Sequence, residues 1–221
     1  MIVGTSGNDD IKVNPGGGAP EIKVKLNGTQ QTFVGVTEIV IYANAGNDNV
    51  QIVGGIGLPV TVFGGAGNDK IVAGGGNSVL VGGEGDDLLV GGAGRDLLIG
   101  GVGADKLVGN ADEDILIAGT TSYDNNAGAL STIMAEWTSS AAYATRVGHL
   151  TGTIPNGLNG AIRLIGDDGA TQTVFNDNDV DTLTGSAGQD WFFANKVADN
   201  GGAIDVVTDQ ASNETYTDTD F

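Results

Sequence analysis

Between Gly64 and Ile117 the chain consists of six consecutive nine-residue units, with no insertion between them. The units read GGAGNDKIV, AGGGNSVLV, GGEGDDLLV, GGAGRDLLI, GGVGADKLV and GNADEDILI. Glycine dominates the first four positions, aspartate holds the sixth in all units but the second, and isoleucine or leucine holds the eighth. A strict short period indicates a stacked repeat fold, in which each unit buries its apolar side chains only against its neighbours.

The residue types at these positions favour a hard metal ion. Glycine makes up 39 of the 221 residues, whereas its share of an average protein is about 7%. Because glycine tolerates positive φ, a GGxG loop can turn several carbonyl oxygens toward one point, and the aspartate two residues later adds a carboxylate. Such oxygen donors suit calcium far better than zinc or copper. The chain has no cysteine and one histidine, which argues against a soft-metal site.

The six units resemble the nonapeptide repeats of RTX proteins, GGxGxDxUx, a calcium-binding β-helix pattern. The resemblance implies a mainly β fold, a parallel β-roll in which two nine-residue half-turns make one coil. Residues 18 apart then stack on the same edge of the roll. One edge carries Asp69, Asp87 and Asp105, and the other carries Ser78, Asp96 and Asp114.

The resemblance also implies that each calcium ion lies between the loops of successive coils on one edge. Aspartates and the carbonyl oxygens of the first four positions hold it. We expect Asp87 to have stacked neighbours on both sides, and Asp114 on only one side within the strict run. The predicted metal ligands are Asp48, Gly64, Ala66, Asp69, Gly82, Glu84, Asp87, Gly91, Ala93, Asp96, Gly100, Val102, Asp105, Asp114 and Asp190.

Two units depart from the pattern. Ser78 replaces the aspartate in the second unit, and its hydroxyl carries no charge. Asp112 replaces the fourth glycine in the last unit, where it either disturbs the loop or adds a ligand.

Weaker copies of the unit lie on both sides of the strict run. They are GTSGNDDIK, ANAGNDNVQ, NDNDVDTLT and GSAGQDWFF, and their sixth residues are Asp9, Asp48, Asp181 and Asp190. Asp181 and Asp190 are nine residues apart, which predicts one further coil. Asp124 is another candidate for the rung after Asp105, with a slip of one residue.

We expect the parts of the chain to pack as one domain. Leu130, Ile133, Met134 and Trp137 follow the i, i+3, i+4, i+7 rule of a helix. The pattern predicts helices over 127–138, capped by Asn125 or Asn126, and over 141–150, capped by Ser139 or Ser140. The predicted parts are an N-terminal β-strand cap with degenerate repeats (1–63), the roll core (64–117), a helical and β capping segment (118–175), and C-terminal repeats with a tail (176–221).

The two outer faces of the roll differ in polarity. The eighth side chain of each unit points inward, so the seventh and ninth point outward. One face includes Lys70 and Lys106, whereas the other is entirely apolar, with Val79, Val81, Leu97, Ile99, Ile115 and Ile117. Monomers avoid such a patch. We expect the two helices to cover it in a monomer; the alternative cover is a second copy, which makes a dimer.

Composition excludes several function classes. With 28 acidic and 9 basic residues the chain carries a formal charge of −19, which disfavours nucleic acid as a partner. No apolar stretch approaches the roughly 20 residues of a membrane span. His149 is the only histidine, so a zinc-protease motif and a histidine-based triad are excluded, and no nucleophile has a nearby base. We therefore expect a protein that is not an enzyme.

We interpret the chain as a calcium-binding structural module of a secreted or cell-surface protein, folding on calcium binding after export. The start, MIVGTSGNDD, lacks the basic and apolar regions of a signal peptide. The closing residues resemble the ends of large secreted bacterial RTX proteins, which implies export by a C-terminal signal. The alternative is a calcium-dependent polysaccharide-binding module attached to an enzyme or adhesin. The expected partners are calcium ions and, for the alternative, extracellular polysaccharide or a cell surface.

Overall fold

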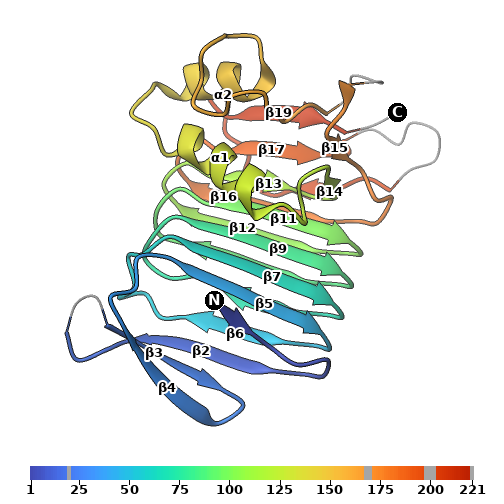
Figure 1. Cartoon of the computed structure of the whole chain (residues 1–221). Coiled ribbons are helices and arrows are strands. Elements are labelled where there is room, and N and C mark those ends of the chain that lie inside the picture. The colour runs from blue at the N-terminus through green and yellow to red at the C-terminus, as the bar shows by residue number, and fades with distance from the viewer. Residues whose placement is uncertain (19–20, 167–170, 197–202, 220–221) are drawn as a thin grey trace.

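Two long β-sheets face each other and enclose an apolar core (Figure 1). The computed structural model describes residues 1–18, 21–166, 171–196 and 203–219. Along the repeats the chain alternates between the two sheets, so each coil adds one strand to each of them. The predicted fold, a mainly β parallel roll with two short helices, is confirmed.

The strands of each sheet follow one another in the order of the coils. The eight-stranded sheet contains β1 (Ile2–Val3), β5 (Ile39–Ala45), β7 (Val60–Ala66), β9 (Ser78–Glu84), β11 (Leu97–Val102), β13 (Ile115–Ile117), β17 (Trp191–Ala194) and β19 (Thr215–Asp218). The nine-stranded sheet contains β18 (Val206–Val207), β16 (Thr182–Ala187), β12 (Lys106–Ala111), β10 (Leu88–Gly92), β8 (Lys70–Val72), β6 (Asn49–Ile52), β2 (Asp10–Pro15), β3 (Glu21–Leu26) and β4 (Thr29–Val34).

The strict repeats pair in the register that their period predicts. Leu89 pairs in parallel with Ile71 on one side and with Leu107 on the other. The side chains at the eighth position all point into the core and are fully buried: Ile71, Leu80, Leu89, Leu98, Leu107 and Leu116. The period of nine therefore sets both the strand register and the composition of the core.

Two segments interrupt the regular coils. The hairpin of β3 and β4 lies between β2 and β6 in the sequence and extends the nine-stranded sheet with antiparallel strands. The chain leaves the roll again after β13 and returns at β16. Between these strands lie β14 (Thr120–Thr121), α1 (Ala127–Trp137), α2 (Tyr143–Thr151) and β15 (Val174–Phe175), with β14 and β15 forming a small antiparallel sheet.

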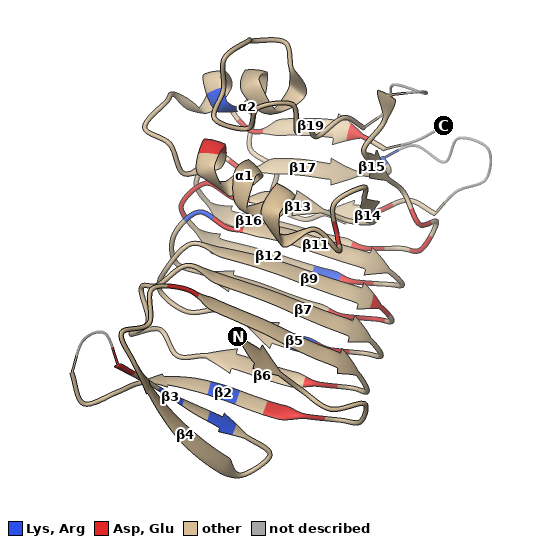
Figure 2. Ribbon diagram, viewed as in Figure 1, with Lys and Arg blue, Asp and Glu red and all other residues tan. Residues whose placement is uncertain are grey.

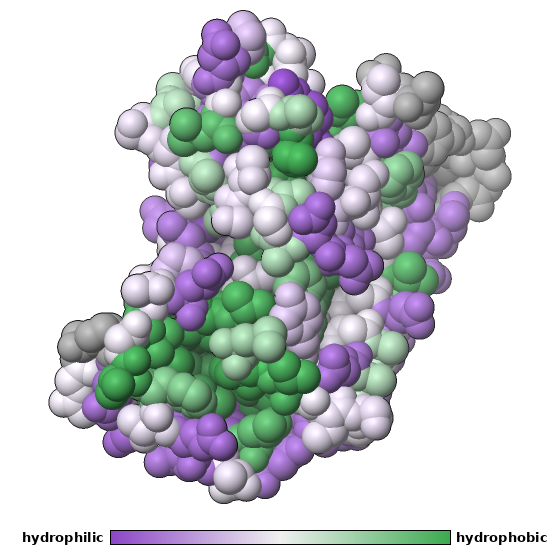
Figure 3. Space-filling model, in the orientation of Figure 1, coloured by the Kyte–Doolittle hydropathy of each residue, from purple (hydrophilic) through white to green (hydrophobic). Residues whose placement is uncertain are grey.

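The N-terminal end of the roll is uneven. Asn27 and Gly28 both adopt positive φ, 48° and 87°, the geometry of a type I′ hairpin turn, and this Asn-Gly pair joins β3 to β4. The nine-stranded sheet thus continues through the hairpin, whereas the eight-stranded sheet ends at the two-residue strand β1. Apolar residues gather at this end (Figure 3) and line a hollow of about 500 Å³ that includes Ile2, Val24, Leu26 and Phe33.

The helices pack against the outer face of the eight-stranded sheet (Figure 1). This second apolar cluster joins Leu130, Ile133, Trp137 and Leu150 to Val79, Val81, Leu97, Ile99, Ile115 and Ile117. Trp191 and Phe193 of β17 belong to the same cluster, and both tryptophans of the chain are fully buried in it. The prediction that the helical pair covers the apolar face is confirmed.

The helix ends agree with the prediction in part. Asn126 caps α1 by accepting a hydrogen bond from the Ala129 N–H at 3.0 Å, as predicted. The predicted serine cap of the second helix is wrong, because α2 begins later, after Ala142, whose methyl group cannot accept a hydrogen bond. Within the described residues, no helix has the length and apolar character that crossing a membrane requires.

Deleting residues 125–152 should cause the protein to self-associate in calcium. The deletion removes α1 and α2 and uncovers the apolar face of the eight-stranded sheet, and exposed patches of this size drive association. Light scattering of the truncated and full-length chains at equal calcium concentration measures the effect. A truncated chain that stays both monomeric and folded would show that the helices are not the essential cover.

Candidate metal sites

Along one edge of the roll, seven aspartates form a continuous ladder. In each rung the backbone N–H of one aspartate donates to Oδ1 of the aspartate one coil later, at 2.6–2.9 Å. This first ladder contains Asp9, Asp48, Asp69, Asp87, Asp105, Asp181 and Asp205. A second ladder precedes strands of the other sheet and contains Ser78, Asp96, Asp114 and Asp190, with rungs of 2.6–2.8 Å.

The ladders bring together every aspartate that the sequence analysis listed as a ligand. Asp181, which that list lacks, occupies the rung after Asp105, 76 residues further along the chain. Asp124 does not join the ladder and instead accepts hydrogen bonds from the N–H and hydroxyl of Thr121. Within the strict run Asp114 has one stacked neighbour, Asp96, as expected, and Asp190 of a flanking copy lies on its other side.

Eight of these carboxylates use only one of their two oxygens. Their Oδ2 atoms are buried and accept no hydrogen bond from any described group: Asp48, Asp69, Asp87, Asp105 and Asp181 in the first ladder, and Asp96, Asp114 and Asp190 in the second. A buried carboxylate oxygen without a partner is costly. Each of these atoms therefore requires a cation or a proton.

The loops that precede the ladders share one backbone shape. In the unit beginning at Gly82, the second and fourth residues, Gly83 and Gly85, adopt φ of 121° and 115°. The last unit keeps this shape although Asn110 and Asp112 replace glycine, with φ of 85° and 68°. In the second unit, Gly74 and Gly76 are not at positive φ, so the loop before Ser78 has a different shape.

The first glycine of these units leaves a space surrounded by oxygen atoms. A methyl group added at Gly82 would lie within 3.0 Å of both Asp87 Oδ2 and the Gly100 carbonyl oxygen of the next coil. Equivalent spaces lie at Gly4, Gly64, Gly91, Gly100 and Gly109, each bounded by the Oδ2 of its own unit and a carbonyl oxygen of a later coil. Carboxylate and carbonyl oxygens from two coils converge there, which is the donor set that calcium prefers.

Three units of the ladders, those of Asp48, Ser78 and Asp190, have less complete spaces. The unit of Asp48 begins with Ala43, and that of Ser78 with Ala73, so a methyl group already occupies the position of the first glycine. At Gly185, which precedes Asp190, the three nearest atoms all belong to Asp190 itself.

The predicted carbonyl ligands Ala66, Glu84 and Val102 lie in the loops of the first edge. Their oxygens accept backbone hydrogen bonds from Gly46, Gly67 and Gly85 of the preceding coil, at 2.7–2.8 Å. Ala93 lies in the second-edge loop and donates its N–H to the Gly74 oxygen at 3.0 Å. A carbonyl oxygen has two lone pairs, so these bonds leave room for a metal contact. Their role as ligands stays a prediction.

Both ends of the first ladder are closed by hydrogen bonds within the protein. Asp9 Oδ2 accepts the Thr5 N–H at 2.6 Å, and Asp9 also accepts bonds from the Thr5 hydroxyl and the Asn27 side chain. Burial acts to raise the pKa of Asp9, and these bonds outweigh it and lower that pKa. At the other end, Asp205 accepts from the backbone of Asp181 and Asn195. Asp9 and Asp205 therefore need no ion.

Between those ends the metal-free carboxyls hold protons unusually tightly. Burial, and after it the neighbouring carboxylates, raise the pKa of Asp87 to about 7 and that of Asp105 to about 8. In the second ladder burial raises the pKa of Asp96 to about 8 and that of Asp114 to about 10. At neutral pH the ladders thus favour either bound protons or bound cations over free charge.

The second ladder is attached to the helices that cover the sheet. Glu113, just before Asp114, accepts bonds from both Arg95 and Arg146, at 2.6 and 2.7 Å. The Glu113 carbonyl oxygen accepts the Trp137 indole N–H at 2.8 Å. The Tyr143 hydroxyl donates to the carbonyl oxygen of Asp190 at 2.8 Å. The loops of this ladder therefore support α1 and α2 directly.

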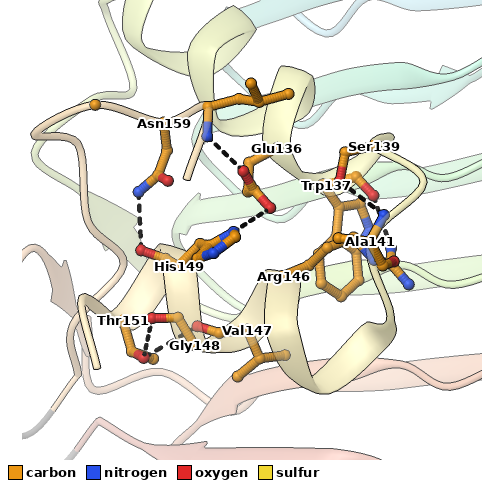
Figure 4. A network of polar contacts seen from close by, with 12 residues as sticks. Glu136, Trp137, Ser139, Ala141, Arg146, Val147, Gly148, His149, Thr151 and Asn159 are labelled. Carbon is orange, nitrogen blue, oxygen red and sulfur yellow. Dashed lines mark hydrogen bonds and ion pairs between the residues drawn. The ribbon is translucent and has the colours of Figure 1, made fainter. Parts of the chain in front are cut away.

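The remaining polar network holds the two helices to each other and to the loop that follows them (Figure 4). The buried Glu136 contacts His149 Nδ1 at 2.7 Å and accepts the Leu158 N–H at 2.6 Å. Arg146 donates to the Trp137 and Ala141 carbonyl oxygens and lies over the Trp137 ring. His149, the one histidine, thus has a structural role.

In chelator, the free energy of unfolding should fall as pH rises from about 4 to about 8. The ladder carboxyls have pKa values above those of the unfolded chain, so over this range the folded chain binds more protons, and stability is lost as they leave. Far-ultraviolet circular dichroism in chelator from pH 4.5 to pH 7.5 measures the trend, because the β signal should be lost as pH rises. Calcium should preserve the signal at pH 7.5, and a β signal in chelator that grows with pH would contradict the prediction.

The comparisons with known proteins agree with this geometry. A family model described as the RTX calcium-binding nonapeptide repeat (4 copies) matches residues 63–98, 90–120 and 175–199. No curated protein and no solved structure matched the chain. The matched ranges contain the rungs from Asp69 to Asp114 together with Asp181 and Asp190. Residues 63–120 and 175–199 therefore carry RTX calcium-binding nonapeptide repeats, which indicate a calcium-binding structural module and here form a parallel β-roll.

Proposed function

We propose that this module folds in response to calcium outside the cell and stays unfolded in a calcium-poor cytosol. The observation that carries the proposal is the set of eight buried Oδ2 atoms that accept no hydrogen bond from the described chain. A calcium ion gives these oxygens the positively charged partner that they lack, so the free energy of calcium binding adds to the stability of the folded state.

The electrostatic cost of an empty ladder supports the proposal. Carboxylates on neighbouring rungs repel each other, by about 4 kcal/mol for two charges 4 Å apart at an effective dielectric constant of 20. Among the carboxylates whose Oδ2 lacks a hydrogen-bond partner, the first ladder has four neighbouring pairs and the second has two. A domain of this kind is stable by only about 5–15 kcal/mol. Without calcium the folded chain must either keep these charges or bind protons that the unfolded chain does not hold at pH 7, and both cost stability that the fold lacks.

We infer ions at five of the six complete spaces and leave out the one at Gly4, because Asp9 there already accepts hydrogen bonds from Thr5 and Asn27. Three lie on the first ladder, beside Gly64, Gly82 and Gly100, and two on the second, beside Gly91 and Gly109. The Oδ2 atoms of Asp48, Asp181 and Asp190 in the same ladders also lack a hydrogen-bond partner. We infer that these carboxylates contribute ligands at the ends of the two rows of ions.

The family match supports an extracellular site of action. RTX repeat proteins are typically exported by type I secretion, which suggests an extracellular location for this chain. We infer that the C-terminal region carries the export signal. Extracellular calcium modules bind in the range of about 0.1 to 1 mM, so the ladders fill after export rather than before it.

Removing calcium at pH 7 should unfold most of the roll. Far-ultraviolet circular dichroism in excess chelator should show loss of the β signal, and added calcium should restore it. Magnesium is the matched control, because its small octahedral shell suits converging carbonyls poorly. A far-ultraviolet spectrum that stays unchanged in chelator would contradict the proposal.

Asp87→Asn should reduce the number of bound calcium ions, whereas Asp9→Asn should leave it unchanged. Asparagine removes the charge in both cases and keeps one side-chain oxygen. That oxygen can accept the rung bond from the Asp69 N–H at position 87 and the bond from the Thr5 N–H at position 9. Asp87 Oδ2 accepts no hydrogen bond, whereas the Asp9 carboxylate already accepts hydrogen bonds from Thr5 and Asn27. Isothermal titration calorimetry gives the two stoichiometries, and equal losses would count against the assignment of open and closed rungs.

A further inference from the structure

The outer face of the nine-stranded sheet gathers most of the lysines of this acidic chain. Five of the six lysines alternate with buried core residues along β2, β3, β8 and β12 and therefore point outward. We call this surface the lysine face: Lys12, Lys23, Lys25, Lys70 and Lys106. Figure 2 shows the basic residues on β2 and β3, whereas acidic residues gather in the turns at the sheet edges.

The register places like charges together on this face. Lys12 lies directly opposite Lys25, and Lys23 is on the same side of β3 as Lys25. None of these lysines forms a salt bridge within the described residues. The acids on the face, Asp10 and Glu21, bond to Asn49 and to the Gly17 N–H instead. Like charges directly opposite destabilise a sheet, and local conflicts of this kind are typical of functional surfaces.

Aliphatic side chains occupy the centre of the same face. Leu88 lies in register between Lys70 and Lys106, and Val72, Val90 and Val108 form a row beside it, all partly exposed. The outward positions of these strands hold no aromatic ring on which a sugar could stack. A sheet surface with lysines around an aliphatic centre matches the interface of an anionic bilayer, where ammonium groups meet headgroups and aliphatic groups meet the acyl boundary.

We propose that the lysine face is a calcium-dependent binding surface for anionic lipid. Without ions the aspartate ladders along both edges repel such a surface, because the whole chain carries −19. Calcium neutralises the ladders, and the lysines then dominate the field above the face. This calcium step rests on the function proposed above, whereas the lipid contact rests on the lysines.

The test uses the full chain with two kinds of vesicle in excess calcium: phosphatidylcholine alone, and phosphatidylcholine with phosphatidylglycerol. Co-sedimentation should occur only with the anionic vesicles and should weaken as salt is raised. Each lysine near an anionic surface raises the partition coefficient of a protein onto the vesicles about fivefold. K12Q/K23Q/K25Q should therefore weaken binding by roughly 100-fold. K70Q/K106Q, on the other side of the face, should weaken it by about 25-fold.

The matched control is K196Q. Lys196 lies off the face, over the Tyr216 ring, so this variant removes one lysine charge elsewhere and should bind like the unchanged chain, whereas one lysine lost from the face should weaken binding about fivefold. Circular dichroism of every variant with and without calcium reports folding separately, so a failure of calcium-driven folding is distinguished from a failure of lipid binding. Three results with folded protein would overturn the proposal. The first is that the lysine variants bind anionic vesicles as well as the unchanged chain does, which indicates that calcium bridges acidic side chains to the lipid. The others are equal binding to phosphatidylcholine vesicles and anionic vesicles, or binding to a soluble polyuronate without binding to vesicles.

Discussion

The hydrogen bond from one aspartate N–H to Oδ1 of the aspartate one coil later is the contact on which the rest of the roll depends. It joins successive coils at the start of each strand and so holds the parallel strands in register. The same bond orients the carboxylate so that its second oxygen points toward the loop and the space beside the first glycine. One interaction thereby links the sheet geometry to the metal chemistry, and neither can be altered alone.

The strict repeats made the core of the fold and of the site predictable. A period of nine with an apolar eighth residue specifies which side chains face inward, and the stacking of Asp69, Asp87 and Asp105 follows from the coil length. Asp181 was missed as a ligand because its rung partner, Asp105, is 76 residues away, and spacing carries no information across an insertion of that size. The sequence also did not reveal that the carboxylates at the two ends of the first ladder have hydrogen-bond partners within the protein. Asp9 carries the motif, but its hydrogen bonds to Thr5 and Asn27 are visible only in three dimensions.

The helices serve the roll in two ways. They cover the apolar outer face of the eight-stranded sheet, and through Glu113 they bond to the loops of the second ladder. Asp114 is accordingly among the most buried of the ladder carboxyls, and burial raises its pKa to about 10. The carboxylates of both edges are buried, and the edges differ in that the loops of the second ladder bond directly to the helical cover.

The outermost strands of the eight-stranded sheet, β1 and β19, lie near the two ends of the chain (Figure 1). A pulling force applied to the termini therefore acts on the coils in series, across the interfaces between neighbouring strands. Such a load acts on the rung hydrogen bonds and the strand pairing between neighbouring coils. With calcium bound between the coils as proposed above, the resistance of the module to a pulling force would increase with the calcium concentration around it.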